Sequence, residues 1–290
     1  MLPEQPPERR PHPLEEQSAP PPPIPADAPR RTPVTLRIPA VSPTATYVLI
    51  AINVLVFIAR AVSVDIDDAL FSWGANNPLA VFGQGELHRL FSAMFLHASI
   101  HLSNGQFAFQ NALHLILNAY IIYVTGRGIE PLFGHLRFAL IYLLGGLAGS
   151  IASALLSPPT VYSVGASGAA FAILGAEFVY LYKHRRLLGE RGRAQMGSLI
   201  TLGLVNLAFG ILTSLSTSGA RIDNWGHIGG ALGGAALAWF IAPFFLPRRD
   251  PTRPDTLIAE DINPLKAHIR TVSMYIAALM LLLIIGSLLY

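Results

Sequence analysis

Apolar segments long enough to cross a bilayer recur along most of the chain after residue 44. A spanning helix needs about 20 mostly apolar residues. Several of these segments contain glycines and small polar residues, whose backbone groups are satisfied inside a bilayer only when the segment is helical. The pattern therefore predicts an all-α fold, a polytopic membrane helical bundle. The predicted spans are 45–64, 109–126, 136–157, 165–182, 197–215, 225–246 and 272–290.

The remaining segments divide the chain around this bundle. Residues 1–43 hold 14 of the 23 prolines and no apolar stretch of the kind that a signal peptide requires. We predict that they form a disordered Pro-rich cytoplasmic tail, although the four prolines at 20–23 can also dock an SH3-like groove. We expect a six-helix core over 44–246, a cytoplasmic linker over 247–271 and a seventh transmembrane helix over 272–290.

The connection over 65–108 differs from an ordinary loop, because aromatic and aliphatic residues such as Phe71, Trp73 and Phe91 are frequent in it. Connections of this length are usually functional or disordered. Amphipathic segments of this kind lie at the membrane interface. We therefore predict a long outer loop that is partly helical and embedded in the membrane.

The composition supports a membrane location and narrows the chemistry. Hydrophobic residues make up 52% of the chain and charged residues 13%, with a mean hydropathy of +0.48, as expected for an integral membrane protein. The chain has no cysteine, which excludes disulfides, thiolate metal sites and cysteine nucleophiles. No cofactor or metal site is predicted. The net charge of +3 comes from basic residues dispersed among loops, so the lipid bilayer is an expected partner and nucleic acid is not.

The distribution of lysine and arginine predicts the orientation. If the N-terminus is cytoplasmic, 17 of the 20 basic residues fall on the inner side of the bundle and only Arg60, Arg89 and Arg221 on the outer side. Cytoplasmic segments carry such an excess, so we predict a multi-pass protein of the cell membrane with a cytoplasmic N-terminus. The spans that begin near 109, 165 and 225 then all enter from the outer side.

A serine and a histidine lie near the starts of two of these inward-running spans. Ser167 stands in the sequence Gly165-Ala166-Ser167-Gly168, and His227 stands in Gly226-His227-Ile228-Gly229-Gly230. Placing a histidine side chain inside a membrane costs free energy, so a histidine found there is a candidate functional residue. It can accept the proton of a serine and so activate that serine as a nucleophile. The other reading, that both stretches are only small-residue packing motifs, loses weight because the two residues share one depth.

Further polar groups are predicted at the same depth. His114 and Asn118 are spaced i, i+4 on one helix face, and both can donate hydrogen bonds to an oxyanion, as can the backbone N–H of Ser167 near its helix N-terminus. The alternative is a purely structural role, in which Asn118 forms an interhelical hydrogen bond with His114 as its partner.

No carboxylate is an obvious third member of a catalytic triad. We predict that Asp223 and Asn224 cap the helix that carries His227. Glu177 lies about 15 Å deeper than Ser167 by helical rise, and we predict a structural role for it with a histidine, tyrosine or backbone partner.

Taken together, these residues resemble the rhomboid family of intramembrane serine proteases, over about residues 45–246. The matching features are the Gly165–Gly168 motif with Phe171, His227 with Gly230 and Gly234, His114 with Asn118, Glu130 with Gly134 and Arg137, and the long outer loop. The resemblance implies six core helices and a water-accessible cavity that opens outward. It also implies a dyad of nucleophile Ser167 and general base His227, with His114 and Asn118 at the oxyanion and an aromatic stack between Phe171 and His227.

The implied function is that of a serine endopeptidase that cleaves transmembrane protein substrates near their outer ends through an acyl-enzyme. One departure from the family pattern is that Phe95-Leu96-His97 is separated from His114 by a stretch, 98–109, that looks inserted. The alternative function is that of an inactive rhomboid-like protein that binds client transmembrane helices. A solute transporter is a third reading, but no inverted repeat or pair of broken helices supports it.

Overall fold

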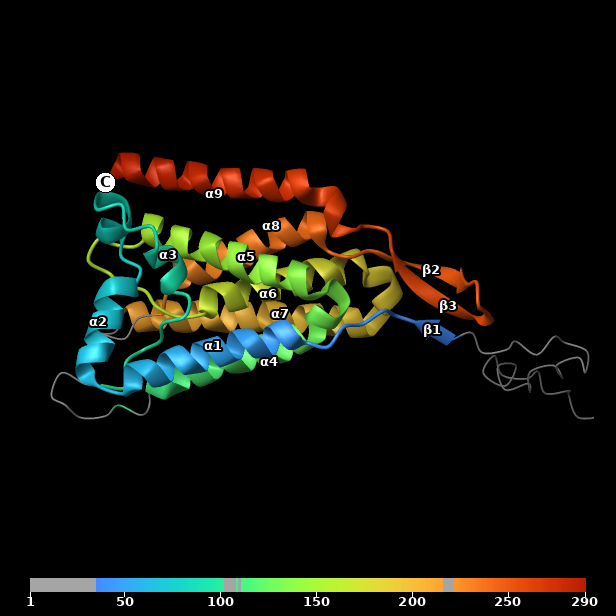
Figure 1. Ribbon diagram of the computed structural model, residues 1–290, viewed down its shortest axis with the longest axis horizontal. Helices are drawn as coiled ribbons and strands as arrows, with labels where there is room; N and C mark the ends of the chain where they lie inside the picture. Colours follow the sequence, from blue (N-terminus) through green and yellow to red (C-terminus); the bar gives the residue numbers. More distant parts are fainter. Residues whose placement is uncertain (1–34, 102–107, 109–110, 216–221) are drawn as a thin grey trace, which may run out of the picture.

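The computed structural model describes residues 35–101, 108, 111–215 and 222–290. Residues 1–34 of the predicted tail over 1–43, and most of the stretch that looks inserted, lie outside the described residues. The described chain is a bundle of long, roughly aligned helices with a small sheet at one end (Figure 1). The long helices are α1 Thr44–Ala61, α4 Ala112–Phe133, α5 His135–Leu156, α6 Ser167–Lys183, α7 Arg185–Ser214, α8 Asn224–Ile241 and α9 Ile269–Leu289.

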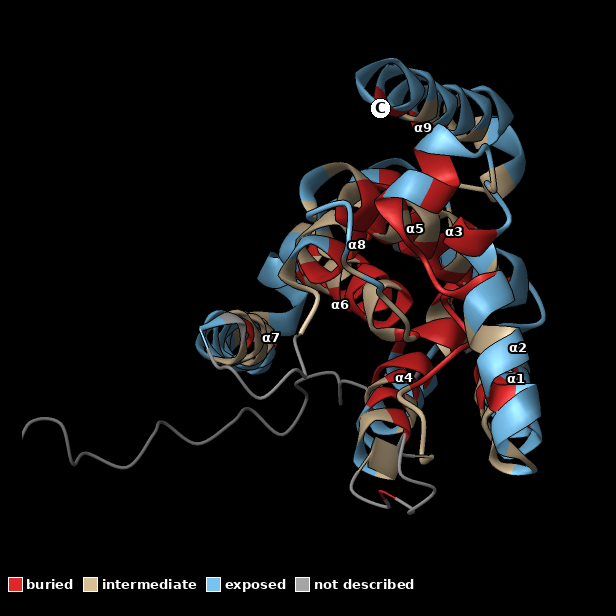
Figure 2. Ribbon diagram, turned by 90° about the vertical axis from the view of Figure 1, so that its left-hand side faces the viewer, coloured by how far each residue is buried: buried red, intermediate tan, exposed pale blue. Residues whose placement is uncertain are grey.

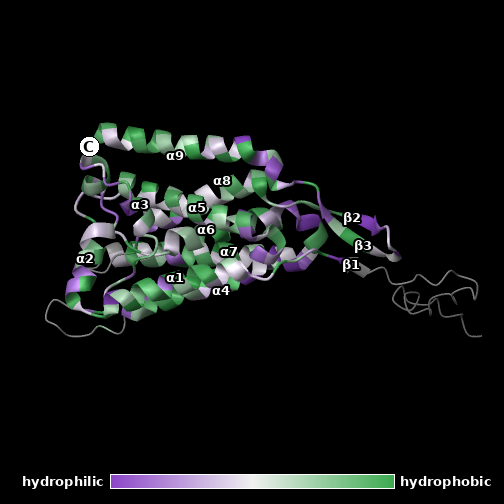
Figure 3. Cartoon of the chain, in the orientation of Figure 1, coloured by the Kyte–Doolittle hydropathy of each residue, from purple (hydrophilic) through white to green (hydrophobic). Residues whose placement is uncertain are grey.

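The helices confirm the predicted membrane bundle. Among the described residues, five segments are long and apolar enough to cross a membrane. Hydrophobic residues, coloured green, occupy much of the length of these helices (Figure 3). The two long helices outside this set differ in exposure. α6 is mostly buried in the centre of the bundle (Figure 2), whereas α8 packs on α5 and α6 with one face and leaves Trp225, Leu232, Trp239 and Phe240 exposed on the other. The five segments are Thr44–Ala61, Ala112–Phe133, His135–Leu156, Arg185–Thr213 and Leu265–Leu289.

Three predicted boundaries are wrong. The span predicted over 109–126 continues to Phe133. The helix predicted over 197–215 begins at Arg185 and contains a break at Gly189, whose φ is 54°. The span predicted over 225–246 ends at Ile241, because Pro243 disfavours helical backbone at the residue before it.

A three-stranded sheet is present where the sequence pattern predicted a linker and the end of the tail. The strands are β1 Thr35–Arg37, β2 Phe245–Asp250 and β3 Arg253–Asp261, in the order β1-β3-β2. β1 runs parallel to β3, and β2 runs antiparallel to it. A short 3-10 turn, Leu265–His268, leads into α9. The sheet therefore joins the segment before α1 to the segment that connects α8 with α9.

The outer loop is partly helical, as predicted. It contains α2 Val64–Gly74, the π-helix η2 Leu79–Gly83 and the short helix α3 Arg89–Ser92. Asn76 and Ser163 exchange backbone hydrogen bonds of 3.0 and 2.8 Å, and the N–H of Gly165 donates to the carbonyl of Ala93 at 2.9 Å. These bonds tie the outer loop to the segment that precedes α6. We call this end of the bundle, where α4, α6 and α8 begin, the outer end.

Candidate active site

Helices α6 and α8 approach each other through their backbones. A Cβ atom at Gly230 would lie 2.0 Å from the carbonyl oxygen of Gly168, and one at Gly234 would lie 2.1 Å from that of Ala172. Real side chains do not tolerate such distances, so these positions accept only glycine. The glycine stripe on α8 therefore brings the starts of the two helices together, as the small-residue spacing indicated.

Ser167 is the first residue of α6, directly after the N-cap residue Ala166, which has no side chain able to accept a hydrogen bond. The first N–H groups of a helix have no intrahelical partner, so the start of α6 presents uncapped donors and the positive end of the helix dipole. Gly165 has a φ of 136°, a conformation that L side chains rarely adopt. The chain thus turns sharply just before the serine.

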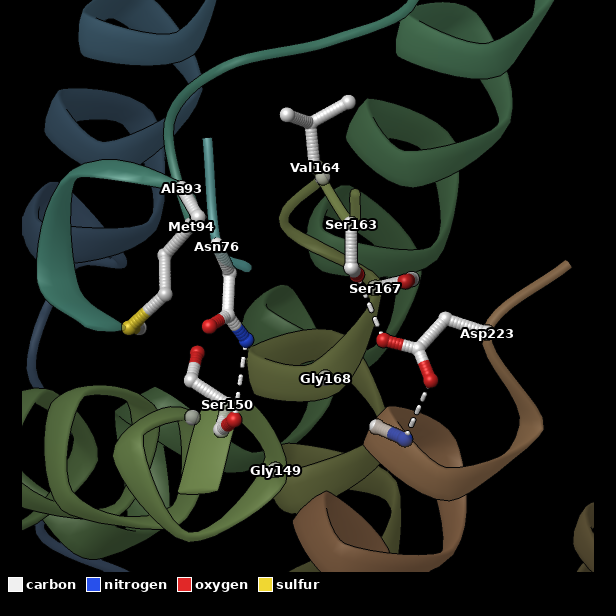
Figure 4. Close-up of a pocket in the computed structure, with 13 residues that line it drawn as sticks. Asn76, Ala93, Met94, Gly149, Ser150, Ser163, Val164, Ser167, Gly168 and Asp223 are labelled. Carbon is white, nitrogen blue, oxygen red and sulfur yellow. Dashed lines mark hydrogen bonds between the residues drawn. The ribbon is translucent and has the colours of Figure 1, made fainter. Parts of the chain in front are cut away.

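The serine lines a small polar cavity (Figure 4). The cavity has a volume of about 20 Å³, which is enough for one water molecule. Asn76, Ser150, Ser163 and Asp223 supply polar groups to its wall. Ser167 is therefore next to a space that can hold water, although the serine belongs to a membrane bundle.

His227 lies in the first turn of α8 and is buried. Its imidazole stacks on the ring of Phe171, one turn after Ser167, with centroids 4.3 Å apart and planes 10° from parallel. No described residue forms a hydrogen bond with its Nδ1 atom, so no carboxylate acts as a third triad member there. The described contacts include no hydrogen bond between Ser167 and His227, and such bonds are often long before substrate binds.

His114 and Asn118 both face the peptide that precedes Ser167. A Cβ at Gly165 would lie 3.0 Å from His114 Nε2 and 3.6 Å from Asn118 Nδ2. Asn118 is buried, and its Nδ2 donates to no described residue. His114 Nδ1 accepts a long hydrogen bond of 3.4 Å from the backbone N–H of Ala98. The two side chains therefore do not bond to each other, and the reading in which they form an interhelical pair finds no support here.

His97 also lies in this layer, although no role was predicted for it from the sequence. Its ring lies 5.3 Å from that of His114, although the two residues are far apart in sequence. Burial, together with the neighbouring His114, lowers the pKa of His97 to about 3, so the ring is neutral at physiological pH. The Phe95-Leu96-His97 motif was the signal that pointed to it.

The acidic residues near the site have structural contacts. Asp223 is the N-cap of α8, as predicted, and accepts hydrogen bonds from Gly226 N at 2.8 Å and Ser163 Oγ at 2.5 Å (Figure 4). Asn224 is not a cap, because its amide donates instead to the carbonyl of Leu207 on α7. Glu177 bonds with Gln195 at 2.6 Å rather than with a histidine, tyrosine or backbone group.

Comparison with known proteins adds the family context. Residues 84–244 match the model of the Rhomboid domain. The chain is 35% identical over 195 residues to Rhomboid protease GluP of Bacillus subtilis (66% of this chain, 34% of the relative). It is 35% identical over 156 residues to RHOMBOID-like protein 6, mitochondrial, of Arabidopsis thaliana (54% and 44%). It is 33% identical over 159 residues to Inactive rhomboid protein 1 of Rattus norvegicus (55% and 16%). The matched region spans less than half the length of these relatives.

Proposed function

This chain belongs to the rhomboid family, and the members similar to it include both a protease and inactive proteins. We propose that it is an intramembrane serine endopeptidase. Its substrates are transmembrane proteins, cleaved near their outer ends. The observation that supports the proposal is that Ser167 begins α6 and His227 lies in the first turn of α8, where glycines bring the two helices into contact and the imidazole stacks on Phe171, one turn after Ser167.

In the proposed reaction, the Ser167 hydroxyl attacks the carbonyl carbon of the scissile peptide while His227 accepts its proton. The negative charge that develops on the carbonyl oxygen receives hydrogen bonds from His114, Asn118 and the N–H of Ser167. His227 then gives the proton to the leaving amine, and an ester joins the acyl part of the substrate to Ser167. Water, which the adjacent cavity can admit, hydrolyses this ester by the same proton route in reverse. A substrate helix must unwind first, because its carbonyls are otherwise held in intrahelical bonds.

The alternative function is a client-binding protein without proteolytic activity. The similarity to Inactive rhomboid protein 1 gives this reading its basis. The presence of both Ser167 and His227 favours the enzyme, since a binding protein needs neither a hydroxyl beside a water-sized cavity nor a histidine held against an aromatic ring.

Covalent labelling tests the nucleophile directly. We expect a fluorophosphonate to label the detergent-solubilised parent, and the label to disappear in Ser167→Ala and His227→Ala. Ser150→Ala is the matched control, because it removes another hydroxyl from the wall of the same cavity and should keep the label. Equal labelling of parent and Ser167→Ala contradicts the assignment, and so does a parent that neither takes the label nor cleaves a transmembrane substrate.

We further propose that the protein lies in the cell membrane with its N-terminus cytoplasmic. The chain has no cysteine, so single cysteines report orientation without background. In intact cells, Thr160→Cys, beyond α5, should react with a membrane-impermeant maleimide, and Thr252→Cys, in the turn between β2 and β3, should react only after permeabilisation. The opposite pattern would reverse the proposed orientation.

A further inference from the structure

A buried ion pair lies at the outer end of α1, apart from the proposed catalytic dyad. Arg60 and Asp67 are 4% and 3% exposed. The Nε of Arg60 donates to Asp67 Oδ1 at 2.6 Å, and Nη2 lies 2.5 Å from the same oxygen. The proposed reaction uses neither residue. A buried ion pair is weak evidence for stability, because desolvation of the two charges offsets much of their attraction. The pair therefore calls for another explanation.

Each member of the pair also holds the chain segment that follows His97. Arg60 Nη1 donates to the carbonyl oxygen of His97, and Asp67 Oδ2 accepts a hydrogen bond from Ser99 Oγ. The carbonyl of Ser99 in turn accepts a hydrogen bond of 2.6 Å from the side chain of Asn111, just before α4. The short segment 97–99 is thus fixed on both sides, between the end of α1 and the start of α4.

The middle residue of this segment contacts His114. The backbone N–H of Ala98 donates to His114 Nδ1, so Nδ1 is the acceptor. In a neutral imidazole one nitrogen carries the proton and the other accepts, and the proton of His114 then belongs on Nε2. This Nε2 faces Gly165, two residues before Ser167. The bond to Ala98 therefore leaves His114 with its donor directed towards the peptide that precedes Ser167.

We propose that Arg60, Asp67 and Ser99 are positioning residues that fix the tautomer and orientation of His114 through the backbone of Ala98. The effect of these residues on catalysis rests on the proposed function. The tautomer of His114 does not depend on it. Networks around a histidine determine which of its ring nitrogens carries the proton. Here the network reaches the histidine through a peptide N–H, and its charged members remain outside the site.

Ser99→Ala is the sharpest test, because it cuts the network without leaving an unpaired charge buried. In the full chain, with a transmembrane peptide as substrate, we expect kcat to fall about tenfold, a fraction of the loss typical for removing an oxyanion donor, and KM to change less than twofold. Ser99→Thr keeps the hydroxyl and should restore kcat. Ser72→Ala is the matched control, because its hydroxyl bonds only within α2, to the carbonyl of Ala69, and it should match the parent.

A second measurement reads the tautomer without relying on activity. In 15N-histidine-labelled protein, with the His114 signals identified by their loss in His114→Asn, the parent should show a protonated Nε2 and an unprotonated Nδ1. Ser99→Ala should show a mixture of tautomers. A parental tautomer together with a parental kcat in Ser99→Ala overturns the inference and leaves the proposed function intact. An inactive parent with the predicted tautomers overturns the proposed function and leaves the structural part of the inference standing.

Discussion

Helices α8 and α7 are both neighbours of α6 in the bundle, and they are attached to it in opposite ways. α8 meets α6 through backbone contacts at Gly230 and Gly234. α7 stands apart from the centre of the bundle (Figure 2). Only 6% of the residues in its most apolar stretch are buried by the rest of the protein. Its described polar ties to neighbouring helices are the hydrogen bond from Gln195 to Glu177 and the contact between its Leu207 carbonyl and Asn224.

This difference separates a rigid part of the molecule from a loosely held one. The proposed dyad, Ser167 and His227, lies on α6 and α8, where close packing leaves little room for displacement. α7 has few buried apolar contacts, and such elements open at low free-energy cost. The proposed dyad therefore lies on the tightly packed pair of helices, and the loosely packed helix α7 carries neither of its residues.

The largest effect should come from filling the glycine contact. Gly230→Leu places a side chain where even a Cβ would meet the Gly168 carbonyl at 2.0 Å. Overpacking of this kind costs about 3 kcal/mol or more, and we expect loss of folded protein in detergent, measured by thermal unfolding. Gly203→Leu on α7 is the matched control, because no atom lies within 4 Å of a Cβ there. Equal unfolding temperatures for the two variants would refute the contrast between the helices.

The next effect concerns the aromatic ring that joins α6 to the proposed base on α8. Phe171→Ala removes a buried ring and should lower the free energy of unfolding by about 3 kcal/mol, with a large loss of turnover because His227 loses its stacking partner. Phe171→Leu keeps most of the volume, so its unfolding temperature should stay close to that of the parent while turnover still falls. Parental turnover in Phe171→Leu would show that the stack has no part in positioning the histidine.

The sequence predicted the bundle and its glycine contact because both depend on local composition. Apolar runs identify helices in a bilayer by length alone, and the spacing of Gly226, Gly230 and Gly234 marks one face of a helix. The same reasoning missed the first part of α7, over 185–196, because this segment is rich in polar and charged residues and has no apolar run. Its four arginines, two leucines and Glu190 are good helix formers all the same.

Other features depend on contacts between distant parts of the chain, which a local pattern does not contain. β1 pairs Thr35 with Thr256 and Leu36 with Leu257, and a strand of three residues has almost no periodicity to detect. The rings of His97 and His114 lie 5.3 Å apart, but the two residues are 17 positions apart in the sequence, so no local pattern indicated their contact. The proposed roles of Ser167, His227, His114 and Asn118 followed from motif and depth, but the network behind His114 required coordinates.

A moderate effect should follow from loosening the start of α8. Asp223→Ala removes the N-cap of this helix and the acceptor of the Ser163 hydroxyl. Loss of a cap and of a charge-assisted hydrogen bond should cost about 2 kcal/mol, measured as a lower unfolding temperature, with reduced turnover because His227 follows one turn later. Asp68→Ala, an exposed position in α2, should unfold like the parent. If both variants match the parent, the cap does not hold the two helices together.

The smallest effect should appear at the tie between α7 and α6. Gln195→Ala removes the hydrogen bond to the buried Glu177 carboxylate and should cost about 1 kcal/mol. Because α7 has few other contacts, we expect this cost as faster amide hydrogen exchange in the part of α7 around Gln195, with exchange in α8 unchanged. Ser198→Ala, whose hydroxyl bonds within α7 to the Ala194 carbonyl, should leave both patterns as in the parent. Faster exchange spread equally over α7 and α8 would mean that the two helices open as one unit, and the distinction between a tight pair and a loosely held helix would then be wrong.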